Sequence, residues 1–274
     1  MTELIRKIKT VDELTFTDDG MFQAVLHEPD LCAELVERLL HINVSHVEYP
    51  ELEAQIAPYF SSKGVRLDVF LKDSDKVIDV EMQTIIKPSL GKRLRYYQSM
   101  LDIDSLMKGQ KYSELKESYI LFICKEDPFK DENGKSYGLS CYSFKNTCLE
   151  KKEVNLHDNS LKVVYNASAY EKEKDEKIKN FLHFINTNEP GEDDFSSRLS
   201  ATVERLKNND KFRSTYLSMN LHDFDIREEG RLEGAQQKAI ETAKNLYANG
   251  VSIEIIAKSL GMTEEQIKEI VNEK

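Results

Sequence analysis

The chain lacks several features that would place it in a specialised class of protein. It has no tryptophan, and none of its apolar runs approaches the roughly 18 residues that a membrane-spanning helix needs. Its N-terminal segment also lacks the apolar core of a secretory signal peptide. These absences predict a cytoplasmic protein that makes no membrane contact.

Cysteine is scarce as well. The chain has four cysteines, none of which forms a CxxC pair, and a chain of 274 residues does not need disulfides to fold. Reduced thiols are therefore expected, in preference to a disulfide framework or a zinc site. The cysteines are Cys32, Cys124, Cys141 and Cys148.

Positive charge is also in short supply, because the formal net charge is −11. Proteins bind nucleic acid mainly through clustered Lys and Arg side chains. Any contact with nucleic acid must therefore be local, and the densest basic group is Lys87, Lys92, Arg93 and Arg95. A solvated helix face explains these four side chains equally well.

The apolar spacing that is present predicts a mixture of helices and strands in the first two thirds of the chain. Helical spacing covers residues 16–41, with a break at Pro29, and residues 91–108, where Tyr97 and Ile103 are expected to face inward. Strand-like runs are expected at 52–60, 65–72, 76–83, 119–124, 139–144 and 161–165. A charged helix is expected at 168–186.

A linker is predicted from Asn188 to Ser196, where proline, glycine and an acidic run occur together. It divides a main domain, 1–188, from a helical region, 189–274. Helices are expected there at 196–208, 211–219, 228–248, 253–260 and 264–271. The last two resemble a helix-turn-helix, but Glu264 and Glu265 begin the second helix and disfavour DNA binding. Self-association, giving a homo-oligomer, or contact with a partner protein is the favoured role.

Two of the strand-like runs predict a β-hairpin from Val65 to Gln83. A two-residue turn at Ser74 and Asp75 pairs residues whose numbers sum to 149. Alternation then places three apolar pairs on one face and sets Arg66 opposite Gln83, Asp68 opposite Glu81 and Phe70 opposite Asp79 on the other. A three-residue turn would shift this pairing by one residue.

The pair Asp68 and Glu81 predicts a divalent-metal site. Two carboxylates that face each other repel, unless a cation lies between them or one of them is protonated. Mg²⁺ or Mn²⁺ prefers oxygen ligands, and such an ion can bind a phosphate and activate a water. A solvated polar face on a two-stranded ribbon is the alternative.

The run RLDVFLKDSDKVIDVEMQ, from Arg66 to Gln83, resembles the core of the PD-(D/E)XK nuclease superfamily, in the branch called Rpn family recombination-promoting nuclease or putative transposase. Further similar segments occur in the same order between residues 16 and 168: TDDGMFQAVL, RLRYYQSM, CKEDPF, YSFKNTCLE and LHDNSLKVVYNAS. The resemblance implies an α/β core with a mixed sheet flanked by helices. It also implies a metal-dependent DNA endonuclease linked to recombination or mobile elements.

The resemblance implies roles for individual residues. Asp68 and Glu81 match the metal-binding acids, the backbone carbonyl of Met82 completes the ligands, and Gln83 stands where the superfamily has lysine. A neutral amide orients water but supplies no positive charge. Arg66, Arg93 or Arg95 is a candidate for the missing cation, and these arginines together with Lys92 are expected to contact DNA.

Two further residues carry alternatives. Asp19 is a candidate supplementary acid, or else the N-cap of the helix that follows it. Tyr97 and its neighbour Tyr96 are candidates for stacking on unpaired bases, although at least one of the two should lie in the core. For the whole chain, the alternative to a nuclease is a catalytically weak or inactive nuclease fold that serves as a protein-interaction module, because Gln83 replaces the lysine.

Overall fold

The protein is described from a computed structural model, which covers residues 9–44, 55–56, 65–86 and 88–272. Its centre is a five-stranded sheet in the order β3-β4-β5-β7-β6. The strands are β3 (Val69–Lys72), β4 (Lys76–Gln83), β5 (Glu117–Cys124), β6 (Cys141–Phe144) and β7 (Ser160–Asn166). β4, β5 and β7 run parallel, whereas β3 and β6 are antiparallel edge strands. The mixed α/β architecture expected from the sequence is confirmed.

The middle of the sheet is β5, and it is buried on both faces as expected. Residues 120–124 form its continuous apolar run, and each of them is 0% exposed. Parallel strands need cover on both faces, because their connections place helices there. The end of β5 therefore lies deep in the molecule, beside the ends of β4 and β7.

The β3–β4 hairpin has the predicted register. Val69 pairs with Val80 and Leu71 with Ile78, and the amide of Asp73 donates to the carbonyl of Lys76 at 2.9 Å. A one-residue shift would have moved the apolar side chains of one strand to the opposite face of the sheet, so alternation and the short turn specify the same pairing.

The expected strand from 65 to 72 is interrupted. Its first part is β2 (Val65–Arg66), which pairs with β1 (Gln55–Ile56) in a separate two-stranded sheet. Arg66 pairs with Gln55 of β1, and the pairing of β3 with β4 begins at Val69. The remainder of the expected strand at 52–60 lies outside the described residues.

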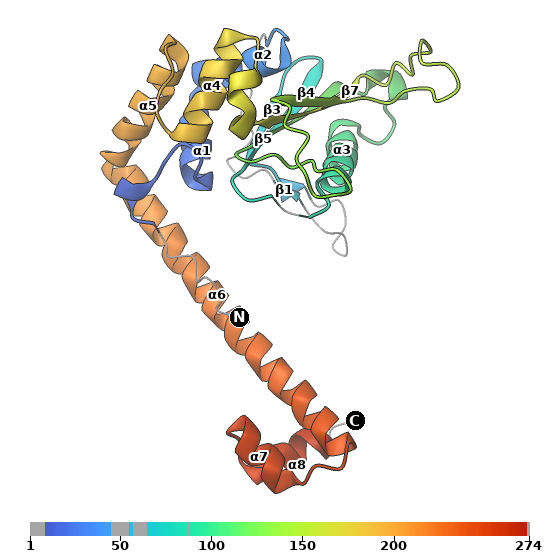
Figure 1. Cartoon of the computed structure of the whole chain (residues 1–274), viewed down its shortest axis with the longest axis vertical. Coiled ribbons are helices and arrows are strands. Elements are labelled where there is room, and N and C mark those ends of the chain that lie inside the picture. Colours follow the sequence, from blue (N-terminus) through green and yellow to red (C-terminus); the bar gives the residue numbers. More distant parts are fainter. Residues whose placement is uncertain (1–8, 45–54, 57–64, 87, 273–274) are drawn as a thin grey trace. The chain divides into compact units, whose positions relative to one another are not determined.

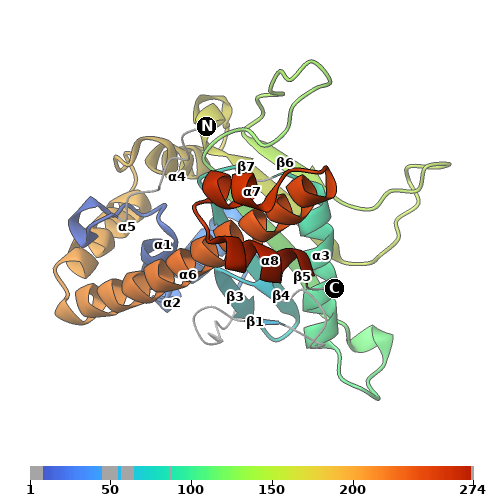
Figure 2. The same cartoon turned by 90° about the horizontal axis from the view of Figure 1, so that it is seen from below.

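Helices cover the sheet on two sides. α1 (Asp19–Leu26), α2 (Pro29–Leu40) and α4 (Glu176–Thr187) lie on one face, and α3 (Leu90–Ser105) lies on the other (Figure 1, Figure 2). Short 3-10 helices occur at η1 (Val11–Glu13), η2 (Tyr112–Glu114) and η3 (Ala167–Lys172). The hydroxyl of Tyr165 on β7 donates to the carbonyl of Leu39 at 2.8 Å and so ties the sheet to α2.

α3 packs on the sheet through one side. Leu94, Met100 and Leu101 are buried in a cluster with Phe122 of β5. Ile103, which was expected to face inward, is 51% exposed, so that prediction is wrong. The last turn of α3 therefore adds little to this core.

The helix α5 (Asp194–Lys207) packs against α1 and α4. The compact part of the chain that contains the sheet accordingly extends to Arg213, and a second unit begins at Ser214. The boundary expected between residues 188 and 189 lies inside the first unit. The proline, glycine and acidic residues of that segment make a tight connection between α4 and α5.

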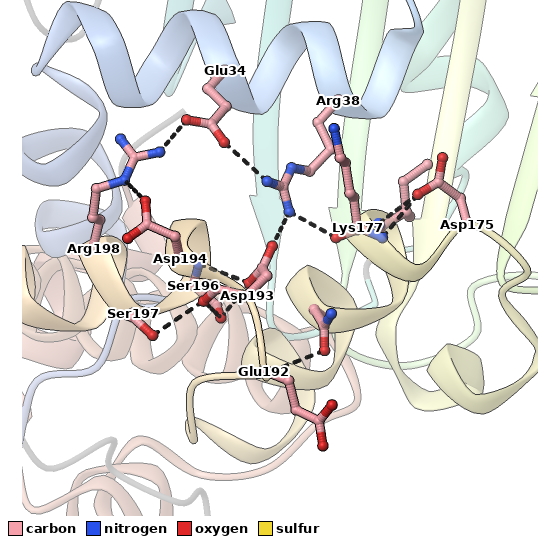
Figure 3. Close-up of polar contacts among 12 residues, drawn as sticks. Glu34, Arg38, Asp175, Lys177, Glu192, Asp193, Asp194, Ser196, Ser197 and Arg198 are labelled. Carbon is pink, nitrogen blue, oxygen red and sulfur yellow. Dashed lines mark hydrogen bonds and ion pairs between the residues drawn. The ribbon is translucent and has the colours of Figure 1, made fainter.

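An ion-pair network anchors α5 (Figure 3). The guanidinium of Arg38 on α2 donates to Glu34, to Asp193 and to the carbonyl of Lys177, the last at 2.9 Å. Arg198 on α5 pairs with Glu34 in turn. Because Arg38 is largely buried and its contacts reach α4 and the start of α5, the network orders three helices that are distant in sequence.

The second unit is helical. It contains α6 (Asp210–Ala248) from Ser214 onward, α7 (Ile253–Leu260) and α8 (Glu264–Asn272). Ala243, Ile256, Ala257 and Ile267 form its small core. α6 is continuous where two helices were expected, because the segment contains no proline to interrupt its hydrogen bonds. No helix in the described part of the chain is long and apolar enough to span a bilayer.

Candidate active site

The candidate site occupies the end of β4 on the face covered by α3. Asp79, Glu81 and Gln83 alternate along this face and lie beside Ile120, Phe122 and Cys124 of β5. The three polar side chains are buried, with exposures of 0%, 2% and 8%. Two acids and an amide at the centre of an apolar face are costly for stability, which makes the position a candidate functional site.

The structure brings Asp68 and Glu81 together. The backbone amide of Asp68 donates to Oε1 of Glu81 at 3.0 Å, and the amide of Met82 donates to Oδ2 of Asp68 at 3.1 Å. Each carboxylate is therefore held by the backbone of the neighbouring segment. Asp68 lies just before β3, at the interruption of the expected strand, so its side chain reaches β4 from the gap between β2 and β3.

A cation from α3 completes the cluster. The Arg93 guanidinium donates to Oε1 of Gln83 at 2.8 Å and lies 3.7 Å from Oε2 of Glu81. It also lies over the rings of Tyr97 and Phe122, with its central carbon 5.5 and 5.3 Å from the two centroids. Among the side chains that the structure describes, Arg93 is the arginine that contacts both Glu81 and Gln83.

The amide of Gln83 bridges two parts of the site. Its Nε2 donates to the backbone carbonyl of Met82 at 2.8 Å, while its oxygen accepts from Arg93. The Met82 side chain points to the opposite, apolar face and is buried there. The Met82 carbonyl, which was expected to be a metal ligand, thus accepts a hydrogen bond from Gln83, which was expected to orient water.

Tyr97 lies at the edge of the cluster. Its hydroxyl accepts from Arg93 at 3.4 Å and its ring packs near Phe122, so most of the side chain is covered. Burial raises the pKa of its hydroxyl, and the nearby Glu81 carboxylate raises it further. Tyr96, its neighbour on α3, is exposed.

Asp79 is a member of the site that was not singled out from the sequence. Both of its carboxylate oxygens are buried and have no hydrogen-bond partner among the described residues. Burial raises the pKa of Asp79 well above its usual range, the Glu81 and Asp68 carboxylates raise it further, and the Arg93 guanidinium lowers it. The signal was available in the alternation of β4, which places Asp79 on the same face as Glu81.

Other predicted residues lie outside this cluster. Lys92 and Arg95 are exposed on α3, where solvent or a phosphate can reach them. Asp19 is exposed in the first turn of α1, on the opposite side of the sheet (Figure 1, Figure 2). The N-cap of α1 is Asp18, so neither expected role of Asp19 receives support.

The buried Asp127 explains the DPF segment in structural terms. Its carboxylate accepts hydrogen bonds from the Tyr142 hydroxyl at 2.9 Å and from the Gly138 amide at 2.6 Å. It therefore anchors the loop after β5 onto β6. Part of a hollow at the ends of β5 and β7 is lined by Asp127, together with Lys130, Asn166 and Lys172.

The donor set suits a hard divalent cation. Asp68, Glu81 and the Met82 carbonyl supply oxygen atoms, and Mg²⁺ typically takes one or two carboxylates and keeps several waters. Within the described ranges, no group of three or more His, Cys, Asp or Glu side chains is arranged to hold a metal ion. A site of two carboxylates fits that observation, and the unpartnered oxygens of Asp79 show that the site has acceptor capacity that the protein itself does not satisfy.

Comparison with known proteins gives one match. A model of the family described as PD-(D/E)XK nuclease family transposase matches residues 21–230. No curated protein and no solved structure gives a match. The matched region includes the whole five-stranded sheet, the Asp68–Glu81 pair and Arg93, and the mixed sheet flanked by helices is consistent with the PD-(D/E)XK fold.

Proposed function

We propose that this chain, which belongs to the PD-(D/E)XK nuclease family transposases, is a metal-dependent endonuclease that hydrolyses phosphodiester bonds in DNA. The observation that carries the proposal is the convergence of Asp68 and Glu81 beside the Arg93 cation. A structural role does not account for buried carboxylates at this position, because apolar side chains would stabilise the same face. A link to recombination or mobile elements follows from the family alone.

Asp68 and Glu81 are the residues that would hold Mg²⁺ or Mn²⁺, with the Met82 carbonyl as a third oxygen donor. When bound, such an ion lowers the pKa of a water and offsets the charge of the scissile phosphate. The Met82 carbonyl accepts one hydrogen bond from Gln83, and its second lone pair is available to a metal ion. The second amide hydrogen of Gln83 would orient a water, while its oxygen accepts from Arg93.

Arg93 supplies the positive charge that Gln83 lacks. Its guanidinium already lies between Glu81 and Gln83, where a superfamily lysine would extend from the strand. A fixed cation in a largely enclosed site stabilises negative charge that develops on a phosphate during attack. Stacking over Tyr97 and Phe122 holds the guanidinium in one orientation.

Lys92 and Arg95 are proposed to contact the DNA backbone next to this site. Both are exposed on α3, the helix that carries Arg93. Arg66 belongs to the same proposal from its position in the sequence. Local contacts of this kind are compatible with a net charge of −11, since only one part of the surface needs to be basic.

The test is cleavage of supercoiled plasmid by the full chain with Mg²⁺, Mn²⁺ or EDTA. The native protein is expected to nick or linearise the plasmid with a metal, while Asp68→Ala and Glu81→Ala are expected to lose at least about 10²-fold in rate. Asp104→Ala is the matched control, because this carboxylate on α3 pairs with Lys72 and lies outside the cluster. A native protein that leaves the plasmid intact, or active-site variants that cut as fast as native, would contradict the proposal.

The rival is a nuclease fold that has lost its activity and acts as an interaction module. The observation in its favour is that Gln83 holds the Met82 carbonyl and Arg93 pairs with Glu81, so the cluster is already closed by its own contacts. In that case the native chain and both acid variants would be equally inert in the plasmid assay. Retained folding of all the variants, measured by circular dichroism, separates this outcome from simple unfolding.

A further inference from the structure

Asp79 stands out among the carboxylates of the described chain because both of its oxygens are sealed from solvent without a partner. An unsatisfied buried polar group costs roughly 1–3 kcal/mol, and a buried charge costs more. Most buried polar groups in native proteins have a hydrogen-bond partner. The two buried oxygens of Asp79 therefore have acceptor capacity for a group outside the polypeptide.

Asp79 lies on the face of β4 that carries the candidate metal site, so a group bound by its oxygens would lie there. Asp79 is two residues before Glu81 on the same strand and on the same face, beside Ile120 of β5 and Phe70 of β3. The alternation of β4 places its carboxyl on the α3 face, the same face as the Glu81 carboxylate of the candidate metal site.

Direct coordination by all three acids does not fit the structure. Among the described side chains, Asp79, Asp68 and Glu81 are not arranged as a set of three that could hold one metal ion. One intervening water removes this difficulty, because Mg²⁺ holds its waters at roughly 2.1 Å and retains several of them.

We infer that Asp79 is a positioning residue that accepts a hydrogen bond from a water held by the divalent cation of the Asp68 and Glu81 site. The inference rests on the proposed function and deepens it, since it assigns the third acid of the cluster to the outer shell of the ion. Carboxylates in that shell orient the inner ligands, and their removal typically weakens metal binding by about 10- to 100-fold.

The experiment is a titration of the metal-free full chain with Mn²⁺, followed by electron paramagnetic resonance. Asp79→Asn keeps the size of the side chain and removes its charge, and it is expected to weaken Mn²⁺ binding by about tenfold. The spectrum of the remaining bound Mn²⁺ is expected to change in line width, because its water shell loses one anchored member. Asp104→Asn, which neutralises a paired carboxylate on α3, is expected to match the native protein in both respects.

A purely structural role for Asp79 predicts a different pattern. Asp79→Asn would then leave the affinity and spectrum of Mn²⁺ as in the native protein, whatever its melting temperature in EDTA, and that result would overturn the inference. Asp79→Ser serves the same purpose if Asp79→Asn does not fold, since the smaller side chain fits the same space and also removes the carboxylate.

The outcomes also separate this inference from the proposed function. If native protein binds Mn²⁺ and cuts plasmid while Asp79→Asn binds equally well, the role of Asp79 is wrong and the nuclease proposal stands. If native protein binds Mn²⁺ and cuts nothing, a lower affinity of Asp79→Asn still supports the role of Asp79. A native chain that binds no Mn²⁺ overturns both.

Discussion

The two faces of β4 are equally buried and chemically opposite. Ile78, Val80 and Met82 face α1, α2 and α4, whereas Asp79, Glu81 and Gln83 alternate with them and face α3. All six side chains are between 0% and 8% exposed. Burial alone therefore does not distinguish a supporting face from a functional one.

The difference lies in how each face meets the cost of burial. An apolar side chain gains roughly 25 cal/mol for each Å² removed from water, so the first face stabilises the fold without further partners. The second face must place Arg93 and backbone amides against its carboxylates, and it still leaves Asp79 unpartnered. Natural proteins keep such conflicts mainly where the chemistry requires them.

The largest loss of stability is expected when a charge is placed on the apolar face of β4. Val80→Asp is expected to destabilise the protein by about 4 kcal/mol or more, because it would bury a charge at a fully buried position on an apolar face. Val80→Ala, the matched control, is expected to cost only roughly 2 kcal/mol for the lost methyl groups. Urea unfolding followed by circular dichroism measures both, and equal losses in the two variants would show that the faces do not differ as described.

Removing the cation from the α3 face should affect activity more than stability. Arg93→Ala is expected to lower the rate of plasmid cleavage by about 10²-fold, because the site loses the fixed charge that replaces the superfamily lysine. Arg93→Lys should recover part of the rate, although lysine lacks the planar stacking over Tyr97. Cleavage by Arg93→Ala at the native rate, with Mg²⁺ saturating, would assign the charge to another residue.

Replacing Asp79 by valine should make the metal-free protein more stable. Burial raises the pKa of Asp79 in the folded state. The unfolded chain releases this proton once the pH exceeds the ordinary Asp pKa of about 3.9, whereas the folded protein still holds it. Native stability is therefore lost as pH rises from that value toward the raised pKa. Asp79→Val lacks this loss and is expected to gain about 1–3 kcal/mol at neutral pH in EDTA.

Urea unfolding of native protein and Asp79→Val at several pH values measures this difference. The gap between the two should widen as the pH rises above about 4. A gap that is constant with pH, or a less stable valine variant, would show that Asp79 has a partner in the metal-free protein.

The smallest effect is expected at Arg95, on the exposed side of α3. Arg95→Ala should weaken DNA binding modestly and reduce the slope of log affinity against log salt by about 1, because one phosphate contact is lost. Fluorescence anisotropy with a labelled duplex in Ca²⁺, at several salt concentrations, provides the measurement. An unchanged slope would remove Arg95 from the proposed interface.

Several features of the fold were predictable from local sequence. The hairpin register followed from a period of two and a two-residue turn, both of which act between residues close in the chain. The helices α7 and α8 were predicted almost to the residue, because Ser252 caps the first and Gly261 ends it with a left-handed backbone. Local signals also placed the break before α2 at Pro29, the first residue of that helix.

Other features depended on contacts between distant segments, which a single sequence does not specify. The segment that read as a linker, 188–196, became a tight connection because Arg38, far earlier in the chain, pairs with Asp193. The expected strand at 65–72 is divided, and its first part pairs with β1, which comes from an earlier part of the chain.

The sequence by itself determined that Asp68 and Glu81 would meet, since both acids lie on one hairpin whose pairing is set by nearby residues. Only the tertiary structure decided which arginine reaches them and that Asp79 would be sealed beside them. The physical reason is that α3 covers this face through apolar contacts of Leu94 and Leu101, and those contacts determine which side of the helix faces the acids.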